Sequence, residues 1–105
     1  MTVSPLAPAS FPELPVIAGV RFATAEAGVK YRGRADVMLA EISAGSSIAG
    51  VFTKSATRAA PVLDCQAKLG TVSDPEAGFA IIVNSGNANA FTGRNGLASV
   101  DAVTR

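Results

Sequence analysis

The sequence predicts an α/β fold of the α+β type, in which a mixed sheet is accompanied by a few helices. Four short runs rich in apolar and β-branched residues, at 16–22, 35–42, 48–53 and 79–83, are bounded by turn-forming residues, as strands are. Two other stretches, 61–69 and the region after Gly96, repeat apolar residues at helical spacing. No internal repeat or charge run divides the chain, so a single unit is expected.

The chain opens with a proline-rich segment. Prolines at positions 5, 8, 12 and 15 each fix φ and lack a backbone donor, which favours an extended arm over a helix or a central strand. An arm at residues 1–15 is therefore expected to precede an incomplete α/β domain at residues 16–105. Within that domain, the β-branched residues of Val16–Phe22 predict a first strand, and Thr24–Gly33, with its two glycines, predicts a loop or a hairpin.

The next two apolar runs predict a hairpin. Ala35–Ile42 has a nearly continuous apolar middle, and Ile48–Thr53 follows after a glycine and two serines. Because glycine and serine favour tight turns, the two runs are expected to pair as antiparallel strands.

The second half of the chain predicts a helix, a strand and another helix. A helix is expected at Pro61–Leu69, because proline favours the first turn and a glycine follows the last apolar residue. Phe79–Val83 is the most hydrophobic segment, and its length and β-branching predict a buried strand. Leu97 and two valines spaced three residues apart predict a helix that begins near Leu97.

The composition of the chain excludes several classes of function. The chain has 105 residues, 49% of them apolar and 16% charged, with a net charge of +1. Without a basic excess it is not expected to bind nucleic acid, and the basic run Lys30–Arg34 is expected to be a solvated hairpin. With one cysteine and no histidine it predicts no disulfide and no metal site, and Cys65 is expected in the core. No signal peptide or membrane-spanning run is found, so the cytoplasm is expected.

The segment from Asn84 to Gly93 carries the candidate chemistry. Glycine permits positive φ and asparagine side chains tie down turns, so such a loop can hold backbone N–H groups around a ligand. It can equally be a plain connection. One alternative function is a small-ligand or phosphate-binding module ahead of a helix, although P-loop and dinucleotide motifs are missing. Another is a pure assembly domain, which the high apolar content favours.

Five short motifs stand in a specific order. They are Ala18-Gly19-Val20-Arg21, Lys30-Tyr31-Arg32-Gly33-Arg34-Ala35-Asp36, Ala49-Gly50-Val51-Phe52-Thr53, Ala59-Ala60-Pro61-Val62-Leu63 and Val83-Asn84-Ser85-Gly86-Asn87-Ala88-Asn89-Ala90-x-Thr92-Gly93. Together they resemble the N-terminal half of ornithine acetyltransferases (glutamate N-acetyltransferases). The resemblance covers nearly the whole chain.

The resemblance implies part of a self-cleaving, multifunctional enzyme of arginine biosynthesis, with the chain as the N-terminal part of the alpha subunit. The precursor cuts itself before a threonine, which becomes the N-terminal nucleophile of a beta subunit. The acetyl group passes from N-acetylornithine to that threonine and then to glutamate, and some members also use acetyl-CoA as donor. The implied partner is the beta subunit, in a heterotetramer of two alpha and two beta chains. No metal or further cofactor is implied.

The threonines of this chain do not sit in the family's cleavage motif. The nucleophile and the substrate-binding residues are therefore expected beyond Arg105. The chain alone is expected to be inactive.

Thr92 and Gly93 match the Thr-Gly pair of the family's oxyanion hole. A hydroxyl and a backbone N–H aimed together would stabilise the negative charge that acyl transfer places on a carbonyl oxygen. From the residues alone, Thr92 could instead cap the following helix while Gly93 turns the chain. The roles exclude each other, because a cap accepts a hydrogen bond and an oxyanion donor gives one. The residues expected to shape the loop are Asn84, Gly86, Asn87 and Asn89.

Overall fold

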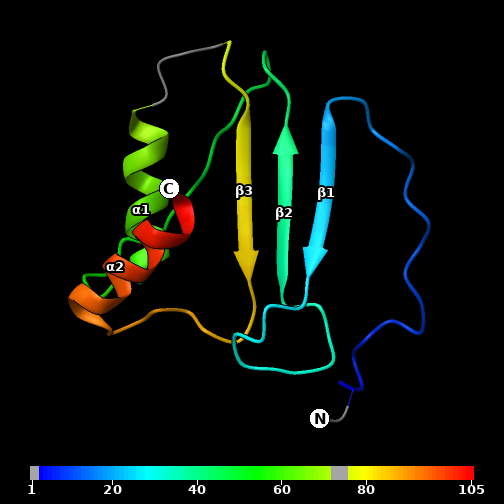
Figure 1. Ribbon diagram of the computed structural model, residues 1–105, viewed down its shortest axis with the longest axis horizontal. Helices are drawn as coiled ribbons and strands as arrows, with labels where there is room; N and C mark the ends of the chain where they lie inside the picture. The colour runs from blue at the N-terminus through cyan, green and yellow to red at the C-terminus, as the bar shows by residue number, and fades with distance from the viewer. Residues whose placement is uncertain (1–2, 72–75) are drawn as a thin grey trace.

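The computed structural model describes residues 3–71 and 76–105, and it has the predicted α+β fold (Figure 1). A three-stranded sheet is formed by β1 (Val20–Ala25), β2 (Val37–Ile42) and β3 (Phe79–Asn84), in the order β1-β2-β3. Both pairings are antiparallel, so the sheet of the described residues is not the mixed sheet that was expected. The register aligns Phe22 with Ala40 and Ala40 with Ile81, so one face of the sheet collects apolar side chains from all three strands.

The first strand begins later than predicted. Gly19 has a φ of 88° and its carbonyl accepts the N–H of Ser43 at 2.8 Å, so the chain turns there before it pairs with β2. Residues 16–19 therefore lie outside the strand, and β1 extends into the segment expected to be a loop. The arm expected at 1–15, whose first two residues lie outside the described residues, is exposed and runs beside the β1 edge of the sheet (Figure 1).

The predicted strand at Ile48–Thr53 is wrong. These residues form an irregular connection between β2 and α1 (Ala60–Gly70). Both edges of β2 are already paired, one with β1 and the other with β3, so no backbone groups of β2 are left for a third partner. The hairpin partner of β2 is β1.

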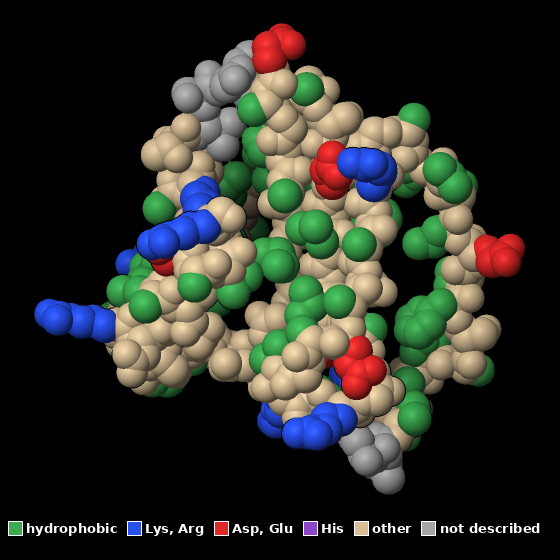
Figure 2. Space-filling view, viewed as in Figure 1, with side chains coloured by type: hydrophobic (Ala, Val, Ile, Leu, Met, Phe, Trp, Pro, Cys, Tyr) green, Lys and Arg blue, Asp and Glu red, His purple; other side chains and the backbone are tan. Residues whose placement is uncertain are grey.

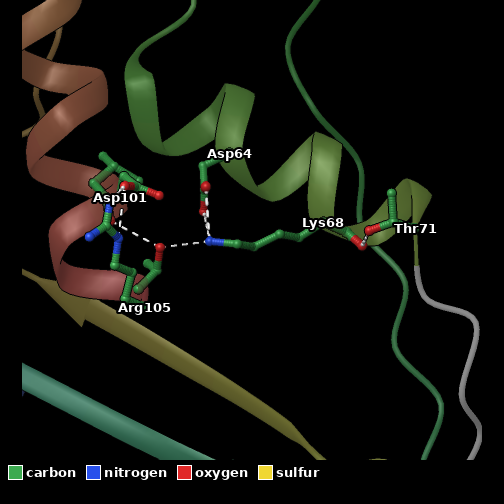
Figure 3. A network of polar contacts seen from close by, with 7 residues as sticks. Asp64, Lys68, Thr71, Asp101 and Arg105 are labelled. Carbon is green, nitrogen blue, oxygen red and sulfur yellow. Dashed lines mark hydrogen bonds and ion pairs between the residues drawn. The ribbon is translucent and has the colours of Figure 1, made fainter.

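Two helices pack against each other beside β3 (Figure 1). The first, α1, has Pro61 in its first turn, as predicted. The second, α2 (Gly93–Thr104), begins four residues before the expected Leu97. Lys68 of α1 lies between Asp64, with Nζ 2.7 Å from Oδ2, and the Thr104 hydroxyl of α2, also at 2.7 Å, so it bridges the helices (Figure 3).

Burial in the described residues is limited. The buried apolar residues are Ala40 and Ala60, at 5% and 6% exposure. β3 is a strand, but the prediction that it is buried is wrong, since Ile81 and Val83 are 40% and 50% exposed. The helices stand beside the sheet rather than across it, so apolar side chains over the strands remain exposed (Figure 2). The prediction that Cys65 lies in the core is also wrong, since this residue is exposed on α1.

No helix within residues 3–71 and 76–105 has both the length and the hydropathy that crossing a bilayer requires.

Candidate active site

The loop that follows β3 is closed by its own asparagine side chains. Asn84 Nδ2 donates to the carbonyl of Asn87 at 2.8 Å, and Asn87 Oδ1 accepts the N–H of Asn89 at 3.1 Å. Bonds of this kind fix short polar loops because they replace the pairing that a strand or helix would provide. Asn84 and Asn87 therefore make hydrogen bonds of the kind that a loop-shaping role requires.

Gly86 brings this loop against the connection between β1 and β2. Its φ is 95°, and a Cβ at this position would lie 2.7 Å from Lys30 Cβ and 3.1 Å from Tyr31 Cε2. The Tyr31 ring is itself covered by the Arg34 guanidinium, 4.3 Å from the ring centroid. Basic side chains gather at this end of the sheet (Figure 2). Only a residue without a side chain fits this approach.

Asp36 fixes the β1–β2 connection on which Gly86 rests. It is 4% exposed, and its carboxylate accepts the N–H groups of Ala27 at 2.6 Å and Val29 at 2.8 Å. These two bonds hold the pKa of Asp36 below its ordinary value of 3.8, against a smaller opposing effect of desolvation. The Asp36 carbonyl also accepts the N–H of Ser85 at 2.9 Å. One residue therefore ties the connection to the start of the candidate loop.

The second half of the loop has an unusual backbone. Asn89, Phe91 and Gly93 have φ values of 49°, 57° and 55°. Left-handed conformations are costly for residues with a Cβ, and the side chain of Phe91 is 84% exposed, so packing does not explain its conformation. Strain of this kind is often found at functional sites.

Thr92 lies between these positions and α2. Its hydroxyl donates to the carbonyl of Asn89 at 3.1 Å and makes no hydrogen bond to the first turn of the helix. The capping hypothesis for Thr92 is therefore wrong, because a cap would accept a backbone N–H. The N–H of Gly93 has no acceptor among the described residues, as is usual for the first turn of a helix.

The carbonyl of Asn89 joins the loop to the first helix, since it also accepts the N–H of Ala60 at 3.3 Å. A cavity of about 200 Å³ lies at this junction, between the starts of α1 and α2. Its lining consists of Thr57, Arg58, Ala60, Leu63, Asn89, Phe91, Thr92, Gly93 and Leu97. It is mostly apolar, and Arg58 adds a positive charge.

The structure thus brings Thr92, Gly93 and Asn89 together at one cavity. Asn84 and Gly86 lie at the other end of the loop, near Asp36. Sequence reasoning missed the residues that α1 and the segment before it contribute, Arg58 among them. No local signal could have revealed them, because the contact between Ala60 and Asn89 joins positions far apart in the chain.

Among the described residues, no group of three or more His, Cys, Asp or Glu side chains is placed to hold a metal ion. The polar groups of the residues that line the cavity are the hydroxyls of Thr57 and Thr92, the amide of Asn89, the backbone N–H of Gly93 and the guanidinium of Arg58.

Comparisons with known proteins identify the family. Residues 21–105 match the model of the ArgJ family. The "Arginine biosynthesis bifunctional protein ArgJ" of Ruegeria pomeroyi is 67% identical over 103 residues, which is 98% of this chain and 25% of that protein. Proteins of the same name from Nitrobacter winogradskyi and Agrobacterium fabrum are 56% and 50% identical, over 90% and 100% of this chain and 22% and 24% of their own length.

The chain spans about a quarter of the length of these relatives. No solved structure matches it. Because the ArgJ family model matches residues 21–105, which is most of the chain, the chain belongs to the ArgJ family.

Proposed function

We propose that the chain is the N-terminal part of the alpha subunit of an ornithine acetyltransferase, and that it supplies the oxyanion hole of that enzyme. The threonine nucleophile of the complete protein attacks the acetyl carbonyl of N-acetylornithine, and ornithine leaves with a proton. The amino group of glutamate then attacks the acyl-threonine, which releases N-acetylglutamate and the free nucleophile. Acetyl-CoA is a second candidate donor of the acetyl group. The reaction takes place in the cytoplasm.

The observation that carries this proposal is the convergence of Thr92 and Gly93 at the cavity between the two helices. Each acyl-transfer step passes through a tetrahedral intermediate whose oxygen carries negative charge. The Gly93 N–H is free to donate to that oxygen, and the Thr92 hydroxyl can do so by turning its proton away from Asn89. Asn89 keeps its bond from Ala60 when this happens. Family membership and the names of the relatives support arginine biosynthesis as the setting.

The rest of the machinery belongs to other parts of the protein under this proposal. The nucleophile and the substrate-binding residues lie beyond Arg105, and self-cleavage ahead of the nucleophilic threonine produces the beta subunit. Two alpha and two beta chains then form the active heterotetramer. The purified 105-residue chain should transfer no acetyl group from N-acetylornithine to glutamate, and turnover above a contaminant-controlled blank would contradict the assignment.

The test is Thr92→Ala in the complete enzyme. Loss of one hole donor should lower kcat by roughly 10²–10³-fold, or about 2.7–4 kcal/mol, with little change in KM. Thr92→Ser keeps the hydroxyl and should retain most of the activity. Ser99→Ala is a matched control, because the Ser99 hydroxyl also donates to a backbone carbonyl, that of Asn95 at 2.9 Å, and it does not line the cavity. Normal kcat in Thr92→Ala would refute the oxyanion role.

A further inference from the structure

Gly96 lies in the first turn of α2, four residues after Thr92, and it is buried. A Cβ at this position would overlap Thr92 Oγ1 and lie 3.1 Å from Thr92 Cβ. Its φ is not positive, so the backbone conformation itself does not require glycine. Alanine is also the better helix former. A side chain at position 96 therefore fits only if the Thr92 hydroxyl moves.

The Thr92 hydroxyl occupies the space that this glycine leaves. It is held between the carbonyl of Asn89, at 3.1 Å, and the first turn of the helix. A threonine side chain has only three staggered positions for its hydroxyl. A Cβ at position 96 removes the observed one, because non-bonded contacts under 3.0 Å are essentially never found.

We propose that Gly96 is a positioning residue for the Thr92 hydroxyl. The inference rests on the proposed oxyanion role and names a residue that acts through Thr92 without contacting substrate. Any side chain at position 96 displaces the hydroxyl by about 1 Å or forces it into another rotamer. Displacements of that size cost roughly 10²-fold in rate when the displaced group acts in the transition state.

Gly70 provides a matched control. It is also a helical glycine without positive φ, at the end of α1, but nothing lies within 4 Å of a Cβ built on it. Gly70→Ala should therefore change neither activity nor folding by more than a small amount. The comparison separates the general effect of alanine in a helix from the effect of crowding Thr92.

The experiment measures kcat, KM and the thermal midpoint of the complete enzyme with Gly96→Ala, Thr92→Ala, the double variant and Gly70→Ala. Gly96→Ala should lower kcat roughly 10²-fold and leave KM nearly unchanged. In the double variant, the second substitution should lower kcat no further than Thr92→Ala alone, because the hydroxyl that it displaces is gone. Thermal destabilisation by Gly96→Ala should be smaller in the double variant, because the overlap with the hydroxyl is removed and the remaining contacts are with the Cβ of residue 92 at 3.1 Å and the Asn89 carbonyl oxygen at 3.5 Å.

Each outcome is decisive. A normal kcat in Gly96→Ala would overturn the positioning role. So would losses of kcat that multiply in the double variant, because they would show that the two residues act independently. Neither result would affect the test of the oxyanion role, which depends on Thr92→Ala. Normal kcat in Thr92→Ala would instead overturn the proposed function. If Gly96→Ala does not fold, folding of the double variant supports the contact with the hydroxyl, and failure of both variants overturns it.

Discussion

Replacing Gly86 with alanine should destabilise the protein through two separable effects. The residue has a φ of 95°, and a positive φ costs a residue with a Cβ about 1–2 kcal/mol. In addition, the new Cβ would lie 2.7 Å from Lys30 Cβ. A Cβ position is set by its own backbone, so this clash cannot be relieved by a side-chain rotation. Crowding of this kind typically adds about 1–3 kcal/mol, for an expected total of about 2–5 kcal/mol.

Gly45→Ala isolates the first effect. Gly45 has a φ of 84° but nothing within 4 Å of a Cβ built on it, so alanine should cost only the backbone strain of about 1–2 kcal/mol. Urea unfolding of the wild type and both variants, with unchanged m values, gives the two differences. If Gly86→Ala and Gly45→Ala destabilise the protein equally, the candidate loop does not rest on Lys30 and Tyr31 and the description of this end of the site is wrong.

Two further predictions concern charged side chains. The Ala27 and Val29 N–H groups hold the pKa of Asp36 below 3.8, so its carboxylate stabilises the fold fully above that pH and loses this effect as pH falls through the lower folded-state value. The thermal midpoint of wild type minus that of Asp36→Asn should therefore be constant at neutral pH and shrink below about pH 4, and a constant difference down to about pH 2 would contradict this. Lys68→Met keeps the side-chain stem but removes the bonds to Asp64 and Thr104, and it should lower the free energy of unfolding by less than about 1 kcal/mol, with a smaller loss in 1 M salt. A loss above about 2 kcal/mol in urea unfolding would show that the bridge is more than a surface ion pair.

Local patterns were sufficient to predict β2, β3 and both helices. In β3 and in α1, a short apolar segment is bounded by glycine, asparagine or proline. Neighbouring residues along the chain therefore determine whether the segment forms a strand or a helix. Strand pairing is not local. Ile48–Thr53 has the composition of a strand, yet β2 is already paired on both edges by segments on either side of it in the sequence. The exposure of β3 also depends on where the helices pack.

The site divides in the same way. The motif predicts a role for Thr92 and Gly93, but a threonine at the start of a helix is suited to both a cap and a hydrogen-bond donor. Only the bond to Asn89 separates the two. The spacing of Thr92 and Gly96 carried an overlooked signal. Residues four apart share one face of a helix, so a small residue there indicates close packing once α2 is known to begin at Gly93.

The resting position of the Thr92 hydroxyl is compatible with an oxyanion role because two free energies decide where its proton points. Leaving the carbonyl of Asn89 costs about 1 kcal/mol net, the usual value for a neutral hydrogen bond, and that carbonyl keeps the Ala60 N–H at 3.3 Å. A hole donor stabilises the transition state by about 2.7–4 kcal/mol. Under the proposed oxyanion role, donation to the oxyanion is therefore favoured by about 1.7–3 kcal/mol in the transition state, whereas the uncharged carbonyl of bound substrate would compete poorly with the carbonyl of Asn89. An interaction made only in the transition state lowers the barrier without tightening substrate binding, so Thr92→Ala should change kcat and leave KM almost unaltered.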